Sequence, residues 1–126
     1  MAVTISGTSG VTLPNGGVFP AGYFQSSPQT IAASGSTALV SHGLGAQPKL
    51  MYVTLQCISA DLGYSVGDEV PMPFASEYSV GGFTCFANAT QCGSIVNANL
   101  QIANKSTSTF STITYASWKI IFRAWI

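Results

Sequence analysis

The sequence predicts an all-β protein, an antiparallel β-sandwich of about six to eight strands. Two observations carry this prediction. Short runs rich in β-branched and aromatic residues alternate with a period of two, and clusters of Gly, Pro, Asn and Ser separate them. No stretch has the i, i+3, i+4 apolar spacing of an α-helix of normal length. We therefore expect a β-sandwich domain at residues 29–126, preceded by an extended N-terminal arm at residues 1–28.

The strands of the domain are expected in eight runs. These are residues 30–33, 36–42, 49–59, 68–72, 83–88, 94–104, 110–115 and 117–126. In the run 49–59, Met51, Val53, Leu55 and Cys57 share one face, because side chains alternate across a strand. In the last run, Trp118, Ile120, Phe122 and Ala124 likewise share one face.

The arm at residues 1–28 has no charged residue and is rich in Gly, Pro, Ser and Thr. Its prolines and the Asn15-Gly16-Gly17 turn interrupt it too often for long strands. It nevertheless keeps more apolar residues than a disordered tail normally does. These are Val3, Ile5, Val11, Leu13, Val18, Phe19, Tyr23 and Phe24. We expect the arm to become ordered by packing on another chain or on a neighbouring protein.

The scarcity of charge excludes several functions. Charged residues make up 6% of the chain, whereas an average soluble domain has roughly a quarter. We expect neither an enzyme nor a cofactor, because so few ionisable side chains are present. Four scattered cations do not form the basic patch of a nucleic-acid-binding protein. The apolar runs are too short for membrane insertion, and the N-terminus lacks the pattern of a secretory signal, so synthesis in a cytosol is expected.

The ionisable residues do not form a recognisable catalytic or metal motif. His42 is the single histidine and is expected to be structural, ending a strand before the turn at Gly43 and Gly45. Asp68 and Glu69 are adjacent, so on a strand their side chains point to opposite faces. We expect no metal site, because calcium loops supply more acidic oxygens within a short span.

Other polar and small residues are given structural roles. Asn88 and Asn104 match the glycosylation acceptor pattern, but we interpret both as turn residues. Cys57, Cys85 and Cys92 lack the spacing of a metal motif and are interpreted as small buried apolar residues.

The aromatic residues leave two interpretations open. Tyr64, Tyr78 and Trp125 lie in polar or terminal surroundings and suit a sugar-stacking surface. The same amphipathic side chains also suit a protein interface, which is the favoured interpretation. Tyr64 and Tyr78, together with the carboxylates Asp68 and Glu69, are the candidate ligand-binding residues.

Two segments carry a resemblance to known proteins. TISGTSGVTLPNGG, residues 4–17, resembles the start of bacteriophage fibre and tail-associated proteins. QTIAASGSTALVSHGLGAQPKLMYVTLQC, residues 29–57, together with ADLGYSVGDEV, residues 60–70, resembles a small β-sandwich module at the ends of phage fibres, related to the H-type lectins. The resemblance implies a jelly-roll or H-type-lectin-like sandwich with the arm as attachment device.

This resemblance also implies a function. The chain is then a virion structural protein, made in the host bacterial cytoplasm and assembled as a homotrimer that joins other virion proteins through its arm. It would serve as a short fibre tip, a capsid decoration or a head-fibre subunit. Attachment to a host glycan is left open, and the alternative function is a lectin-type module that recognises host surface glycans.

Overall fold

A computed structural model of the chain describes residues 4–6, 10–12, 18–19, 22–32, 37–72, 83–96 and 99–126. Within them the chain forms thirteen β-strands and one short 3-10 helix, η1 (Tyr115–Ser117). Every pairing among the described strands is antiparallel. The predicted all-β, antiparallel fold is thereby confirmed. No helix in these ranges is long and apolar enough to cross a membrane.

The larger sheet is built around two eight-residue strands, β7 (Leu50–Cys57) and β13 (Trp118–Trp125), which pair along their whole length. β8 (Glu69–Pro71) pairs with the other side of β7. β4 (Tyr23–Gln25) and β5 (Gln29–Thr30) pair in succession along the other side of β13. The order of this sheet is therefore β4-β13-β7-β8, with β5 also paired with β13.

Side chains alternate across both long strands with the predicted period of two. Trp118, Ile120, Phe122 and Ala124 of β13 point inward and are at most 1% exposed. On β7 the inward residues Val53, Leu55 and Cys57 are at most 2% exposed. The predicted faces of these two strands are confirmed.

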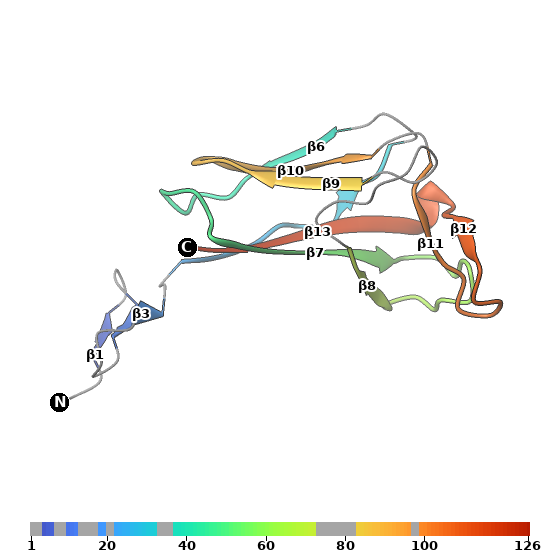
Figure 1. Ribbon diagram of the computed structural model, residues 1–126, viewed down its shortest axis with the longest axis horizontal. Coiled ribbons are helices and arrows are strands. Elements are labelled where there is room, and N and C mark those ends of the chain that lie inside the picture. Colours follow the sequence, from blue (N-terminus) through green and yellow to red (C-terminus); the bar gives the residue numbers. More distant parts are fainter. Residues whose placement is uncertain are drawn as a thin grey trace.

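The second sheet has the order β6-β10-β9, with strands β6 (Thr37–Ser41), β10 (Gln91–Val96) and β9 (Phe83–Ala87). Figure 1 shows this sheet facing β7 and β13 as a second layer. In the turn between β9 and β10, the Asn88 side-chain oxygen accepts hydrogen bonds from the backbone N–H groups of Thr90 and Gln91 at 2.9 and 2.8 Å. The interpretation of Asn88 as a turn residue is confirmed.

One apolar core joins the two sheets. β9 and β10 contribute Phe83, Cys92 and Val96, which pack with the inward residues of β7 and β13. Leu100, Ile102 and Ile113 extend the core past the end of the second sheet. The two layers therefore exclude water from a common interior, while a jelly-roll or H-type-lectin-like topology stays a prediction.

The cysteines are free thiols. Cys57 and Cys92 are fully buried and belong to the core, as the sequence predicts, whereas Cys85 is half-buried. Burial and the neighbouring Cys92 raise the pKa of the Cys85 thiol to about 12. Burial also raises the pKa of Cys92. Neither group therefore has the thiolate character that a nucleophile requires.

A hairpin of β11 (Gln101–Ala103) and β12 (Phe110–Thr112) lies at one end of the two layers (Figure 1). Asn104 begins its turn, because its side-chain oxygen accepts the backbone N–H groups of Ser106 and Thr107. This confirms the interpretation of Asn104 as a turn residue. The prediction of one strand over 94–104 is wrong: β10 ends at Val96 and pairs with β6 and β9, whereas β11 pairs with β12.

The segment interpreted as an arm contains two different structures. β1 (Thr4–Ser6), β2 (Gly10–Thr12) and β3 (Val18–Phe19) form a small antiparallel sheet, in which Ile5 is 80% exposed. β4 also lies within residues 1–28, but it belongs to the larger sheet. At Gly22 the chain passes so close to the Ile126 side chain that this side chain would have to shift to admit a Cβ there. The role of this segment in attachment stays a prediction.

Candidate functional site

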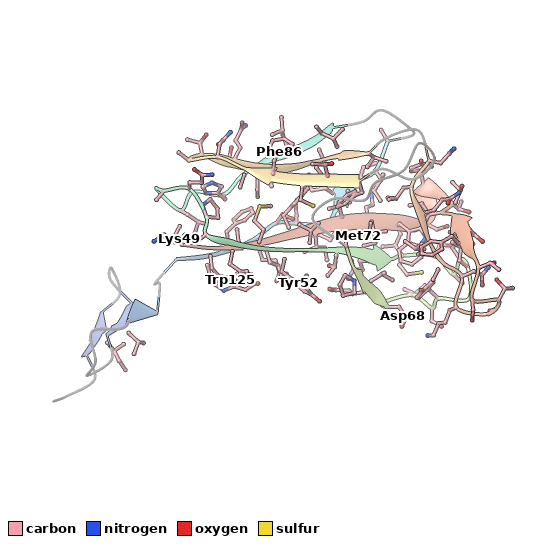
Figure 2. All side chains as sticks on the ribbon, in the orientation of Figure 1. Lys49, Tyr52, Asp68, Met72, Phe86 and Trp125 are labelled. Atoms are coloured by element: carbon pink, nitrogen blue, oxygen red, sulfur yellow. The ribbon has the colours of Figure 1, made fainter. Side chains whose placement is uncertain are left out.

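The outer face of the larger sheet carries a set of exposed and half-buried aromatic, polar and apolar side chains. Because Trp118, Ile120, Phe122 and Ala124 point inward, Arg123 and Trp125 point outward. Figure 2 shows Trp125 and Tyr52 projecting from the side of this sheet that faces away from β6, β9 and β10. We call this set the platform, and its members are Tyr23, Gln25, Leu50, Tyr52, Arg123 and Trp125.

Strand register arranges the platform in two rows across three strands. Trp125 pairs with Tyr23 on β4 and with Leu50 on β7, which makes an apolar row. Arg123 pairs with Gln25 and Tyr52 on the same two strands, which makes a polar row. The rows lie about 7 Å apart, since two residues of a strand separate them.

In the apolar row, Tyr23 and Leu50 are exposed, whereas Trp125 between them is half-buried. The Tyr23 ring lies 5.1 Å from the Trp125 ring, centroid to centroid, with a tilt of 36°. Tyr23 is 50% exposed and Leu50 57% exposed. Aromatic rings so placed on strands present a continuous apolar surface to a ligand.

In the polar row, four hydrogen bonds hold Arg123. Its Nε donates to Gln25 Oε1 at 3.1 Å and its Nη1 to Thr54 Oγ1 at 3.0 Å. Its Nη2 donates to both carboxylate oxygens of Glu69, at 3.1 and 3.0 Å. The guanidinium carbon lies 5.8 Å from the Tyr52 ring centroid. Arg123 is therefore fixed in position, and Glu69 compensates its charge.

Of the predicted ligand-binding residues that the structure describes, Glu69 lies beside the platform, whereas Asp68 and Tyr64 do not. Asp68 accepts a hydrogen bond from Ser65 N at 3.0 Å and pairs with Lys105 at 3.2 Å. These two hydrogen bonds lower the pKa of the Asp68 carboxyl. Asp68 and Glu69 thus have separate partners, which agrees with the expectation that their side chains diverge.

Tyr64 lies near Asp68 and is engaged on several sides. Its hydroxyl donates to the Ala103 carbonyl at 2.8 Å, and its ring meets Trp118 edge-on at 5.4 Å. Lys105 Nζ lies 5.6 Å from the ring centroid. Tyr64 therefore ties the 61–67 loop to the β11–β12 hairpin. Tyr78 lies outside the described residues.

Asp61 joins the same loop to β13. Its carboxylate accepts hydrogen bonds from the Thr114 N–H at 2.7 Å, the Thr114 hydroxyl at 3.1 Å and the Trp118 indole N–H at 2.9 Å. Partial burial acts to raise the pKa of Asp61, but these hydrogen bonds outweigh it and the net pKa is lowered. The carboxylate is a structural acceptor for groups that have no other hydrogen-bond acceptor in the part of the chain that the structure describes.

His42 is a structural residue, as the sequence predicts. It is 5% exposed, and Leu44 N donates to its Nδ1 at 3.1 Å. With Nδ1 accepting, Nε2 donates to the Asn88 carbonyl at 3.0 Å. Gly43 and Gly45 follow in the left-handed turn conformation, with φ of 64° and 76°. In the described ranges, no three His, Cys, Asp or Glu side chains gather in a way that would hold a metal ion.

Sequence reasoning missed most of the platform. Trp125 was named as a possible stacking residue, but Tyr23, Gln25, Tyr52 and Arg123 were not. The alternation of β7 and β13 is a signal that would have placed Tyr52, Arg123 and Trp125 outward. Tyr23 and Gln25 lie beside these residues because β4 pairs with β13. The two strands are separated in sequence by almost the whole chain.

No protein-family model, curated protein or solved structure matches this chain.

Proposed function

We propose that the chain is a structural subunit of a bacteriophage particle that assembles as a homotrimer and contributes to host attachment. It would form a short fibre tip, a capsid decoration or a head-fibre subunit. The observation that carries the assembly role is an uncharged, exposed apolar face on the β6-β10-β9 sheet. The resemblance of residues 4–17, 29–57 and 60–70 to phage fibre proteins supports the viral context.

Three apolar side chains cover this face. Leu39 is 50% exposed and Ile95 45% exposed. Phe86 projects from the same side, away from the larger sheet (Figure 2). Gly93 pairs with both Leu39 and Phe86, and a Cβ on Gly93 would lie 2.9 Å from Phe86 Cζ and 3.2 Å from Leu39 Cδ2. The two side chains therefore close over Gly93 and make the apolar surface continuous. We call Leu39, Phe86, Gly93 and Ile95 the assembly face.

The composition of these strands favours contact with another copy of the chain. The strands TALVS, FTCFA and QCGSIV contain no charged residue, so nothing on them repels an identical surface. The formal net charge of the whole chain is zero, which also leaves copies without mutual repulsion. Closed symmetric assemblies bury such surfaces and remove exposed sheet edges.

The test is the native mass of the purified protein by light scattering. We expect a trimer for the natural sequence and a monomer for the double variant Leu39→Lys/Ile95→Lys, because each lysine would have to be buried unpaired in the interface. Val66→Lys is the matched control, since Val66 is a 69% exposed apolar residue in a turn away from this face. Circular dichroism checks that each variant is folded. A natural protein that is a stable monomer contradicts the homotrimer.

A carbohydrate-binding module is the second candidate function, and the platform is the observation that favours it. Its aromatic rings lie on the opposite layer from the assembly face, so both surfaces are available in one molecule (Figure 2). The two functions are compatible, because a trimeric tip that presents three platforms would attach through all of them.

A further inference from the structure

The platform combines a surface for stacking with free hydrogen-bonding groups. Sugars present apolar C–H faces and polar hydroxyl edges, and a ligand of that kind needs both types of contact. In the apolar row, Tyr23, Trp125 and Leu50 supply the stacking surface. In the polar row, the Gln25 side-chain N–H₂ group and the Tyr52 hydroxyl have no hydrogen-bond partner among the described residues. They flank Arg123 on both sides.

The platform is also held in place before any ligand arrives. Its residues are carried by paired strands and not by loops, so their spacing is set by strand register. Tyr23 donates from its hydroxyl to Gln25 Oε1 at 2.8 Å, and the same oxygen accepts from Arg123. These bonds turn the Gln25 amide so that its N–H₂ group is the free part. Little conformational entropy is then lost on binding.

The charge of the platform selects the class of ligand. Arg123 is the single cation on it, and the two-oxygen contact with Glu69 neutralises it. Glu69 in turn accepts the Thr54 hydroxyl at 3.0 Å, so the carboxylate is satisfied as well. A polyanion such as a nucleic acid or an acidic polysaccharide gains no charge contact here. The surface suits a ligand without charge.

We propose that the platform binds an uncharged glycan chain, with sugar rings stacked on Trp125 and Tyr23 and hydroxyls bonded to Gln25 and Tyr52. This inference names the ligand class for the attachment role proposed above and rests on that role. The platform extends across three paired strands, which suits an extended chain and not a single enclosed sugar.

The experiment is affinity electrophoresis of the full chain in native gels that contain a neutral polysaccharide. The probes are dextran, mannan and a panel of neutral bacterial exopolysaccharides, with alginate as the acidic comparison. We expect retardation in at least one neutral gel and none with alginate. Trp125→Ala is expected to weaken binding at least about tenfold, as loss of one stacking contact would. Tyr52→Ala and Tyr23→Ala are expected to weaken it by smaller factors.

Phe110→Ala is the matched control, because Phe110 is a 74% exposed aromatic residue on β12, away from the platform. It should bind as the natural sequence does. If Trp125→Ala fails to fold, Tyr52→Ala still tests the proposal. Tyr52 is 44% exposed, so its replacement is expected to leave the fold intact. Retardation by no neutral polysaccharide, retardation by alginate alone, or equal weakening by Phe110→Ala would each overturn the proposal.

Light scattering separates this inference from the proposed assembly. If Trp125→Ala converts a trimer to a monomer and no glycan binds, the platform is a subunit contact and the glycan site is refuted. If the natural protein is monomeric but binds a neutral glycan through Trp125, the homotrimer is wrong and the glycan site stands.

Discussion

At the scale of single residues, polar side chains in this protein serve mainly to satisfy backbone and indole groups. Asp61, His42 and Asn88 each make two or more hydrogen bonds: Asp61 joins a loop to β13, His42 joins two turns, and Asn88 holds its own turn. Because only 6% of the residues are charged, hydrogen bonds of this kind fix the positions of loops that ion pairs could fix in a more charged protein. The sequence shows that these residues can form hydrogen bonds, but it does not show which groups they bond to.

Asp61→Ala is expected to lower the free energy of unfolding at pH 7 by about 2–3 kcal/mol, because the Trp118 indole and the Thr114 N–H lose their acceptor. Urea denaturation followed by tryptophan fluorescence measures this. Asp68→Asn is the control and should have the smaller effect, because its partners Ser65 and Lys105 are exposed. Equal effects of the two variants would show that Asp61 has no special structural role.

The same carboxylate makes stability depend on pH. The pKa of Asp61 is lower in the folded chain than the ordinary value of about 3.9, so the stability it contributes is fully present above that value. It is lost as the pH falls through the lowered pKa. The difference in unfolding free energy between the natural chain and Asp61→Asn should therefore shrink below about pH 4. A difference that is constant from neutral to strongly acidic pH contradicts this assignment.

At the scale of elements, the edge of the larger sheet depends on one serine. β4 and β5 both pair with β13, and between them the Ser26 hydroxyl accepts the Phe122 N–H at 3.0 Å. Ser26 N donates to the Phe122 carbonyl at 2.9 Å. The side chain thus replaces a backbone partner where the strand is interrupted before Pro28, which has no N–H.

Ser26→Ala should lower the free energy of unfolding by about 1–3 kcal/mol, since it leaves the buried Phe122 N–H without a partner. Ser27→Ala is the neighbouring control, because Ser27 is exposed. Hydrogen exchange of the Phe122 amide gives a local readout and should be faster in the Ser26 variant alone. Unchanged exchange in that variant refutes the role given to Ser26.

At the scale of the whole molecule, the surfaces to which we assign proposed roles lie on separate parts of the fold. The assembly face lies on one layer, the platform lies on the other, and the small β1-β2-β3 sheet precedes both layers (Figure 1). Sheets as small as β1-β2-β3 are marginal on their own in water, and the 80% exposure of Ile5 leaves apolar surface on it for a partner. This is consistent with the expectation that residues 1–28 attach the protein to a particle.

Deletion of residues 1–21 tests the attachment role and keeps Gly22 and β4 in place. We expect the shortened chain to retain its fold by circular dichroism, because the described core cluster and the β4–β13 pairing are formed by residues that follow position 21. It should no longer be incorporated into particles in a complementation assay. Incorporation equal to that of the full chain excludes attachment through this segment.

The sequence alone determined the strand class and the inward faces of the long strands. Period-two alternation in 49–59 and 117–126 is a local property, set by the geometry of a single strand, so it survives whatever the strand packs against. Turn residues such as Asn88, Asn104 and Gly43 were predictable for the same reason: their side-chain or backbone preferences act within a few residues.

Only the tertiary structure decided which strands pair, and this pairing brings the residues of the platform together. Tyr23 and Gln25 reach Trp125 and Arg123 because β4 lies against β13, although the chain separates them by about a hundred residues. The division of residues 94–104 between β10 and β11 could likewise not be predicted. Its residues alternate as in one strand, but β10 and β11 belong to different sheets. Pairing and register depend on which edges and apolar faces the whole chain can bury together, and local sequence does not record that choice.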